Sequence, residues 1–193
     1  MKAKIGIIGD GNVGSALRRG LEKAGYEVRA VGKEANAVRD AGAWAGVVIL
    51  AVPFGAIDAT LRELGDTVDG KPLVDATNAL TDDMQLAVGF TTSGAENLQK
   101  KAPRAKVVKA FNTAFAGTMD SGRVDGQQLT AFAASDDDAA KRQVLQLVRD
   151  IGFDAVDAGP LKNARWLEAL GYLNIQLGFV VGMGAKIGFR LVH

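Results

Sequence analysis

The sequence contains no cysteine, and its one histidine is the last residue, His193. The lack of cysteine excludes disulfide bonds, thiolate catalysis and cysteine-ligated metals. A histidine at the end of a chain is expected to fray with the terminus. An internal histidine base and a histidine-ligated metal are therefore excluded as well.

A strong charge bias is also lacking, because 23 basic residues stand against 22 acidic ones and the net charge is +1. This balance gives no reason to expect a nucleic acid or an anionic membrane surface as a partner. The apolar run at the N-terminus, MKAKIGIIG, is interrupted by glycines and has no long hydrophobic region, so we expect no signal peptide. We expect a cytoplasmic enzyme.

One long stretch lacks charge altogether: seventeen residues separate Glu168 from Lys186 in LEALGYLNIQLGFVVGMGAK. Asn174 and Gln176 lie in the middle of it, and two amides at bilayer depth would be costly. Six glycines from Gly159 to Gly188 suit close helix packing, although the small-xxx-small spacing of GFVVG at 178–182 also occurs in membranes. We favour a buried helix over a membrane span.

Apolar strand-like runs alternate with helical patterns along the chain, which indicates βαβ units and a parallel sheet. The runs that predict strands are 4–8, 27–31, 47–52, 72–75, 106–110, 129–134 and 153–156. The helical patterns follow residue 12, cover 35–41, 56–64 and 95–101, run from Ser135 to about Asp150, and resume after Pro160. We predict an α/β fold: a Rossmann-type, doubly wound, mainly parallel sheet, forming a single domain over 1–193 with a helical extension over 160–193.

The strongest motif is the glycine loop IGIIGDGNVGSAL, in which Gly9, Gly11 and Gly14 form G-x-G-x-x-G between the first strand and the first helix. Gly9 permits the tight turn, Gly11 lets the backbone approach a pyrophosphate, and Gly14 lets the helix lie close to the strand. The backbone at the start of the helix, including Asn12 and Val13, would hold the phosphates. Asp10 would repel them, so we expect its side chain to point to solvent. The motif predicts a dinucleotide site.

The residues after the second strand bear on which dinucleotide binds. Gly32 ends that strand and Lys33 follows it, and a small residue with a cation suits the 2′-phosphate of NADP. Glu34 complicates this assignment, because an acidic residue could repel the phosphate or bind a ribose hydroxyl. We favour NADP over NAD.

At this point the chain resembles a known family, the NADP oxidoreductases that reduce coenzyme F420, to which the cytoplasmic domain of the STEAP metalloreductases is related. The segments that carry the resemblance are IGIIGDGNVG, ILAVPFGAI (49–57), VDATNAL (74–80), VVKAFNTAF (107–115) and DAGPLKNARWLE (157–168). The family often has Ser-Arg where this chain has Gly32-Lys33, and lysine binds phosphate as a point charge rather than a fork.

The resemblance implies further site residues. In that family the turn matching 51–53 lies beside the nicotinamide ribose, and residues at the position of 112–116 line the nicotinamide and the facing flavin or deazaflavin. The last helix of the family contributes to a homodimer, and Met183 could reach the acceptor pocket. The residues implied for the cofactor are Ala51, Val52, Pro53, Asn78 and Ala116, and those implied for the acceptor are Asn112, Thr113, Phe115 and Met183.

Reduction of a ketone normally needs an acid that delivers a proton beside the hydride. Lys109, Lys162 and Tyr172 stay open for that role. A flavin or deazaflavin needs no such residue, because solvent can protonate the ring and the protein supplies orientation.

Three functions follow. The first is hydride transfer between NADP(H) and a flavin-type acceptor, such as F420, FMN or FAD, without a dedicated acid–base residue. The second is an NADPH sensor whose acceptor side is blocked; Phe54, Phe111 and Phe115 could stack on an acceptor or fill that space. The third is an imine reductase of the pyrroline-carboxylate type, which would need a longer helical C-terminal domain.

Overall fold

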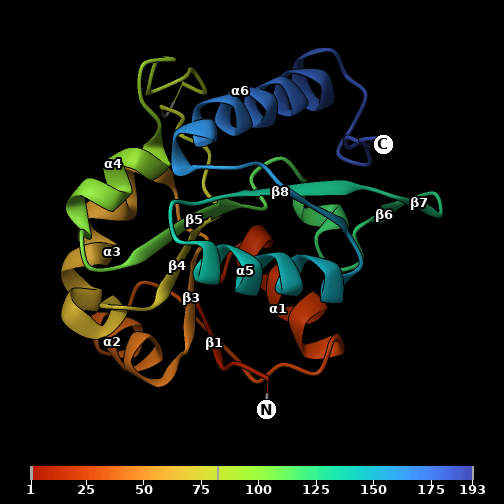
Figure 1. The fold of residues 1–193 in the computed structure, drawn as a ribbon. Coiled ribbons are helices and arrows are strands. Elements are labelled where there is room, and N and C mark those ends of the chain that lie inside the picture. The colour runs from red at the N-terminus through yellow and green to blue at the C-terminus, as the bar shows by residue number, and fades with distance from the viewer. Residues whose placement is uncertain (1, 82, 193) are drawn as a thin grey trace.

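The computed structural model describes residues 2–81 and 83–192. Its centre is a seven-stranded sheet with the order β2-β1-β3-β4-β5-β8-β9 (Figure 1). The strands are β1 (Ile5–Ile8), β2 (Val28–Val31), β3 (Val47–Leu50), β4 (Pro72–Asp75), β5 (Lys106–Ala110), β8 (Thr130–Ala134) and β9 (Asp154–Asp157).

The strands from β2 to β5 are all parallel, and the order reverses at β1, so that β2 lies on one side of it and β3 on the other. β8 pairs antiparallel with β5, and β9 then pairs parallel with β8. The prediction of a Rossmann-type, mainly parallel sheet is therefore confirmed. Ligands of such sheets bind outside the carboxyl ends of the strands, at the point where the order reverses.

Helices cover both faces of the sheet (Figure 1). One hydrophobic core joins the sheet to α1 (Asn12–Lys23) and α5 (Asp138–Ile151). The second core joins the other face to α2 (Ala35–Trp44), α3 (Ile57–Leu64) and α4 (Gly94–Lys101). Strands β1, β3 and β4 are buried throughout, which explains their unbroken apolar sequences. The single domain over 1–193 stays a prediction.

The last helix, α6 (Ala164–Ile175), lies across the carboxyl edge of the sheet, beside the N-terminal end of α4 (Figure 1). Its buried positions include Ala164, Leu167, Gly171 and Asn174, which recur at helical spacing on one face. This helix therefore covers the edge of the sheet where a Rossmann ligand would lie.

The sequence-based interpretation differs from the structure at three places. α5 begins at Asp138 and not at Ser135. Its N-cap is Asp137, whose carboxylate accepts a hydrogen bond from the Ala140 N–H at 2.8 Å, whereas the Ser135 hydroxyl donates to the Val107 carbonyl. The uncharged stretch is not one helix, because α6 passes into a π-helical turn at Gln176–Val180 and the chain then leaves the helical conformation. The short hairpin of β6 (Arg123–Val124) and β7 (Gln127–Gln128) was not predicted.

No helix within residues 2–81 and 83–192 combines the length and the apolarity that crossing a membrane requires.

Candidate functional site

The glycine loop has the backbone that its sequence predicts. Gly9 has φ +113°, and a Cβ atom there would lie 2.2 Å from the carbonyl oxygen of Ala51. A Cβ atom on Gly14 would lie 1.8 Å from the carbonyl oxygen of Gly9. Both glycines are therefore required by packing. Gly11 is different, since a Cβ atom there would meet nothing within 4 Å.

Open space beside Gly11 lies at the N-terminal end of α1, whose first turn contains no acidic residue. Backbone N–H groups at such an end, together with the helix dipole, favour an anion. Gly11 is therefore the glycine that leaves room for a ligand, as the fingerprint requires of its second glycine.

Two cavities open along the carboxyl edge of the sheet. We call the first the lysine cavity; it has a volume of about 730 Å³ and lies between the glycine loop, the end of β2 and the turn after β3. We call the second the amide cavity; it has a volume of about 590 Å³ and lies between the start of α1, the ends of β4 and β5, and α6. Both volumes fall in the range usual for small-molecule sites.

Among the described residues, those that line the lysine cavity include one cation, Lys33, and three carboxylates, those of Asp10, Glu34 and Glu63. Asp10 is exposed, as expected, but its side chain is turned toward the end of β2, because a Cβ atom on Gly32 would lie 3.1 Å from Asp10 Oδ2. The mouth of this cavity therefore combines a cation suited to phosphate with acceptors suited to hydroxyl groups.

The amide cavity takes its name from Asn78, Asn112 and Asn174. Asn112 Nδ2 donates to Asn78 Oδ1 at 3.1 Å and to the Leu167 carbonyl at 2.8 Å. Asn78 Nδ2 donates in turn to the Asn112 carbonyl at 3.2 Å. These bonds fix the loops after β4 and β5 against each other and against α6.

α6 can approach these amides because it presents Gly171. A Cβ atom on Gly171 would lie 2.5 Å from Asn78 Oδ1 and 2.8 Å from Asn112 Nδ2. The close approach of α6 therefore forms the wall of the amide cavity.

The three phenylalanines proposed for the acceptor side have different places. Phe115 lines the amide cavity, with its ring edge-on to that of Phe179 at 5.3 Å between centroids. Phe111 is fully buried in the core, and Phe54 lines a separate cavity of about 440 Å³ beside α4. Only Phe115 of the three is placed to contact a ligand in the amide cavity.

The predicted site residues divide between the two cavities. Those that line the lysine cavity are Gly9, Asp10, Gly11, Gly32, Lys33, Ala51, Val52 and Pro53. Those that line the amide cavity are Asn12, Val13, Asn78, Asn112, Phe115 and Ala116. Segments distant in the sequence thus meet at one edge of the sheet, and the glycine loop contributes to both cavities.

Three predicted residues line neither cavity. Gly14 is buried under the turn, and Thr113 is buried behind the amide cavity with 3% exposure. Met183 lines a smaller cavity of about 330 Å³ near the end of the chain.

Several other residues that line the amide cavity were not predicted from the sequence. They include Ser15, Arg19, Met84, Gly171, Asn174, Ile175 and Phe179. The spacing of Gly171, Asn174 and Gly178 along one helical face was the available signal.

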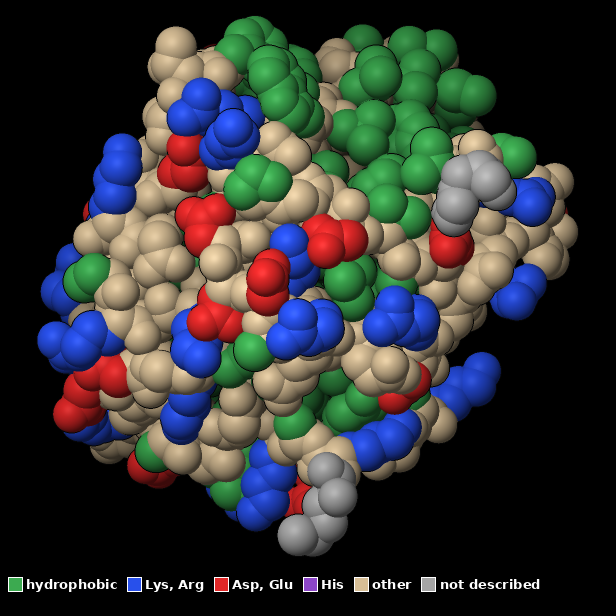
Figure 2. All heavy atoms as spheres, viewed as in Figure 1, with side chains coloured by type: hydrophobic (Ala, Val, Ile, Leu, Met, Phe, Trp, Pro, Cys, Tyr) green, Lys and Arg blue, Asp and Glu red, His purple; other side chains and the backbone are tan. Residues whose placement is uncertain are grey.

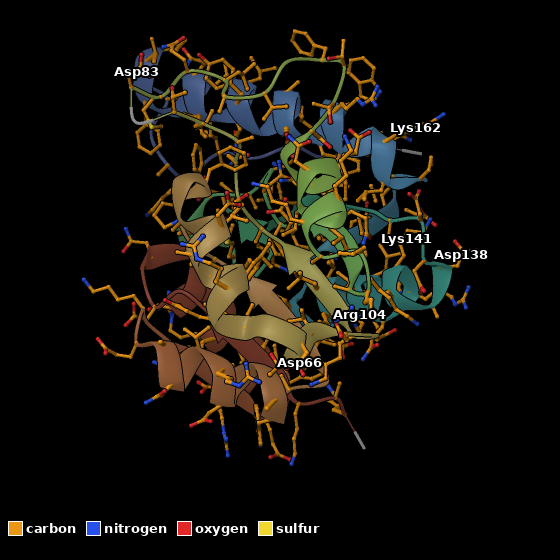
Figure 3. All side chains as sticks on the ribbon, turned by 90° about the vertical axis from the view of Figure 1, so that its left-hand side faces the viewer. Asp66, Asp83, Arg104, Asp138, Lys141 and Lys162 are labelled. Atoms are coloured by element: carbon orange, nitrogen blue, oxygen red, sulfur yellow. The ribbon has the colours of Figure 1, made fainter. Side chains whose placement is uncertain are left out.

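The three candidate proton donors line neither cavity, and Tyr172 is half-buried on α6. Lys109 is fully buried, and its ammonium group contacts Asp75 Oδ2 at 3.0 Å and Glu168 Oε1 at 3.1 Å. We call these three residues the buried charge cluster. Burial alone would lower the pKa of Lys109, but the attraction of the two carboxylates outweighs it and raises that pKa, so the ammonium stays protonated. Lys162 is exposed just before α6 (Figure 3).

The buried charge cluster also positions the site. Glu168 accepts hydrogen bonds from the Gly94 and Ala95 N–H groups at the start of α4, at 2.9 and 3.2 Å. Asp75 accepts from the N–H and the hydroxyl of Thr77, the residue before Asn78. The cluster thus ties α6 to α4 and to the loop that carries Asn78.

Comparison with known proteins agrees with this geometry. No family model matches the chain. The chain is 30% identical over 165 residues to the F420-dependent NADP reductase of Methanocaldococcus jannaschii, and the match covers 81% of this chain and 71% of that protein. The chain belongs to the F420-dependent NADP reductase family. This membership confirms the sequence-based assignment to the NADP-dependent oxidoreductases.

A solved structure from Arthrobacter sp. FB24, provisionally assigned as an F420-dependent NADP reductase, covers 99% of this chain with a TM-score of 0.90 and 29% identity. The chain is also 32% identical over 181 residues to the metalloreductase STEAP3 of Rattus norvegicus, but spans only 36% of that protein. An imine reductase from Myxococcus stipitatus solved with NADP⁺ has a TM-score of 0.70 at 17% identity and shares the fold alone.

Proposed function

We propose that the protein transfers a hydride between NADP(H) and a flavin or deazaflavin acceptor of the F420 type, without a dedicated acid–base residue. The adenosine half of the cofactor would occupy the lysine cavity, and the pyrophosphate would lie at Gly11. The turn at 51–53, which lines the lysine cavity, would then lie beside the adenosine half, whereas the resemblance implies a place beside the nicotinamide ribose. The nicotinamide and the acceptor ring would then share the amide cavity.

The lining of the amide cavity carries this proposal. Among the described residues that line it, Arg19 is the one titratable side chain, and it forms an ion pair with Asp120 at 3.3 Å. The rest are amides, a serine, small and aliphatic residues, two methionines and two phenylalanines. Such a wall can stack and orient two rings but has no group suited to protonating a ketone or an imine. A flavin-type ring, which solvent can protonate, is the acceptor that fits.

The open volume of the amide cavity weighs against a sensor with a blocked acceptor side. Phe115 and Phe179 stand at its wall and leave about 590 Å³. Because aromatic rings prefer offset or edge-on contacts, this pair offers an apolar surface to an acceptor ring.

The preference for NADP rests on membership of the family and on Lys33. The carboxylates of Asp10, Glu34 and Glu63 in the same cavity oppose a 2′-phosphate. We expect Lys33→Gln to weaken NADPH binding about fivefold and to leave NADH binding unchanged, since an exposed ion pair contributes about 1 kcal/mol or less. Lys23→Gln, in the last turn of α1, is the matched control. An equal loss of affinity for NADPH and NADH in Lys33→Gln would show that Lys33 does not contact the 2′-phosphate.

The decisive experiment follows the loss of NADPH absorbance with purified protein and FMN, FAD, riboflavin or F420 in turn, with NADH in parallel. We expect turnover with at least one ring acceptor, faster with NADPH, and a maximal rate that shows no protein ionisation between about pH 6 and pH 9. Tight NADPH binding without turnover on any acceptor would refute the reductase and favour the sensor. Reduction of an imine but of no flavin-type ring would favour the third function.

We also propose that the protein is a homodimer. Large hydrophobic side chains are exposed around the π-helical turn, namely Phe179 (64% exposed), Val180 (72%), Val181 (68%) and Met183 (59%). Figure 2 shows such side chains (green) gathered over the end of α6. An exposed apolar area of this kind is typical of an interface. Sedimentation should give a dimer for the native chain and a monomer for Val181→Glu; a monomeric native chain would refute this.

A further inference from the structure

Asn174 is a buried amide with one unused atom. The residue is 2% exposed, and from the inner face of α6 it lines both the amide cavity and the smaller cavity of about 330 Å³ that contains Met183. Its Oδ1 atom has no hydrogen-bond partner among the described residues. An acceptor that is buried and unpaired costs free energy, so such an atom in a ligand cavity calls for a donor from the ligand.

The orientation of this amide is fixed by its other end. Asn174 Nδ2 donates to the carbonyl oxygen of Thr113 at 3.2 Å. A flipped amide would place Oδ1 against that carbonyl, two acceptors facing each other, so the nitrogen must point to Thr113 and the oxygen must not. The bond joins α6 to the loop after β5, and it holds the amide in place before a ligand arrives.

Two of the three other asparagines that line the cavity, Asn78 and Asn112, already use their side-chain nitrogens. Asn112 uses Nδ2 for Asn78 Oδ1 and the Leu167 carbonyl, and Asn78 directs Nδ2 to the Asn112 carbonyl. These two amides thus fix the loops after β4 and β5. Asn174 Oδ1 remains an acceptor for a group that enters the cavity.

We propose that Asn174 Oδ1 accepts a hydrogen bond from the carboxamide N–H of the nicotinamide and so sets the orientation of that ring. This rests on the proposed function, because it requires the nicotinamide to occupy the amide cavity. Asn12 and Val13, from the start of α1, line the same cavity, so the cofactor enters it from the glycine loop. The carboxamide N–H₂ is the one hydrogen-bond donor on the nicotinamide ring, and no other ring atom can pair with Oδ1.

An orientation set in this way has a consequence for hydride transfer. The carboxamide lies on the carbon next to C4, so a hydrogen bond to it fixes which face of C4 is turned to the acceptor. The residue therefore acts in binding and positioning, and it takes no part in proton transfer.

The test uses a cofactor analogue that lacks the donor. In the 3-acetylpyridine analogue of NADP⁺ a methyl group replaces the carboxamide NH₂, and adenosine 2′,5′-bisphosphate lacks the whole nicotinamide half. Dissociation constants of NADP⁺, the analogue and the bisphosphate are measured by calorimetry for the native chain, Asn174→Leu and Asn174→Ala. Gln176→Leu, which removes an amide from the adjoining turn, is the control.

We expect the native chain and Gln176→Leu to bind NADP⁺ about tenfold more tightly than the analogue. Both Asn174 variants should bring that ratio to about one while binding the bisphosphate like the native chain. A ratio that survives in the Asn174 variants, or a native chain that does not discriminate, would overturn the proposal. If one Asn174 variant does not fold, the ratio of dissociation constants in the native chain and in the other variant still tests the proposal. Absence of turnover on every acceptor, with the expected binding ratios, would refute the reductase and leave this inference standing.

Discussion

Replacing Gly11 by alanine adds one methyl group at a point where no atom of the surrounding chain lies within 4 Å. The backbone there has φ −69° and ψ −165°, an extended conformation that alanine adopts without strain. Alanine is a poorer N-cap than glycine, but it restricts the unfolded chain more, and the two effects oppose each other. We expect the free energy of unfolding to change by less than about 1 kcal/mol.

The same methyl group would occupy the space that a pyrophosphate needs. Displacing the phosphates from the start of α1 loses about two hydrogen bonds to a charged group, each contributing about 1.5–3 kcal/mol. The affinity for NADPH should therefore fall by more than about 100-fold. Urea denaturation measures the first quantity, and calorimetric or fluorescence titration with NADPH measures the second.

Two other glycines serve as controls for Gly11→Ala. Gly14→Ala places a Cβ atom 1.8 Å from the Gly9 carbonyl oxygen, so it should destabilise the fold itself. Gly46→Ala, at the opposite edge of the sheet, has its nearest contact at 3.7 Å and should change neither quantity. If Gly11→Ala binds NADPH like the native chain, or if it unfolds like Gly14→Ala, the assignment of the pyrophosphate to Gly11 is wrong.

The remaining predictions concern the packing around the site. Lys109→Met leaves two buried carboxylates without a cation and should lower the free energy of unfolding by about 3–5 kcal/mol, against less than about 1 kcal/mol for the exposed Lys101→Met, as urea denaturation would measure. Gly171→Ala pushes α6 from the amide cavity, so it should lower the free energy of unfolding by about 1–3 kcal/mol and weaken the binding of NADPH more than that of adenosine 2′,5′-bisphosphate. An equal loss of affinity for the two ligands would contradict this. The hydrogen bonds from Arg165 lower the pKa of Glu96 in the folded state, so this pair stabilises the fold above the unfolded pKa of about 4.3, and the contribution disappears as pH falls through the lower folded pKa. Glu96→Gln should therefore lose less stability than the native chain between about pH 5 and pH 3, and parallel urea midpoints would refute the assignment.

Sequence patterns were sufficient to predict the architecture and part of the site. A strand that is apolar throughout, such as 47–50, must be covered by other elements on both faces of the sheet. Because such strands alternate with amphipathic helices along the chain, the sequence predicts a doubly wound sheet. The glycine loop was equally readable, because Gly9 and Gly14 are required by backbone contacts within a few residues or with the neighbouring strand. The residues of the lysine cavity follow the ends of consecutive strands, where local sequence and sheet topology place them together.

The hydrogen bonds between the amides and the wall that α6 contributes to the amide cavity depend on long-range packing. Asn174 lies more than fifty residues from Asn112. The spacing of Gly171, Asn174 and Gly178 marks one helical face, but it does not show that this face meets the loops after β4 and β5. The same holds for Lys109: its sequence allows a proton donor, but alternation along β5 and the packing of α6 turn its ammonium toward Asp75 and Glu168. Long-range packing fixes these partners, because a buried charge must find a countercharge and a helix can approach an amide only where it presents a glycine.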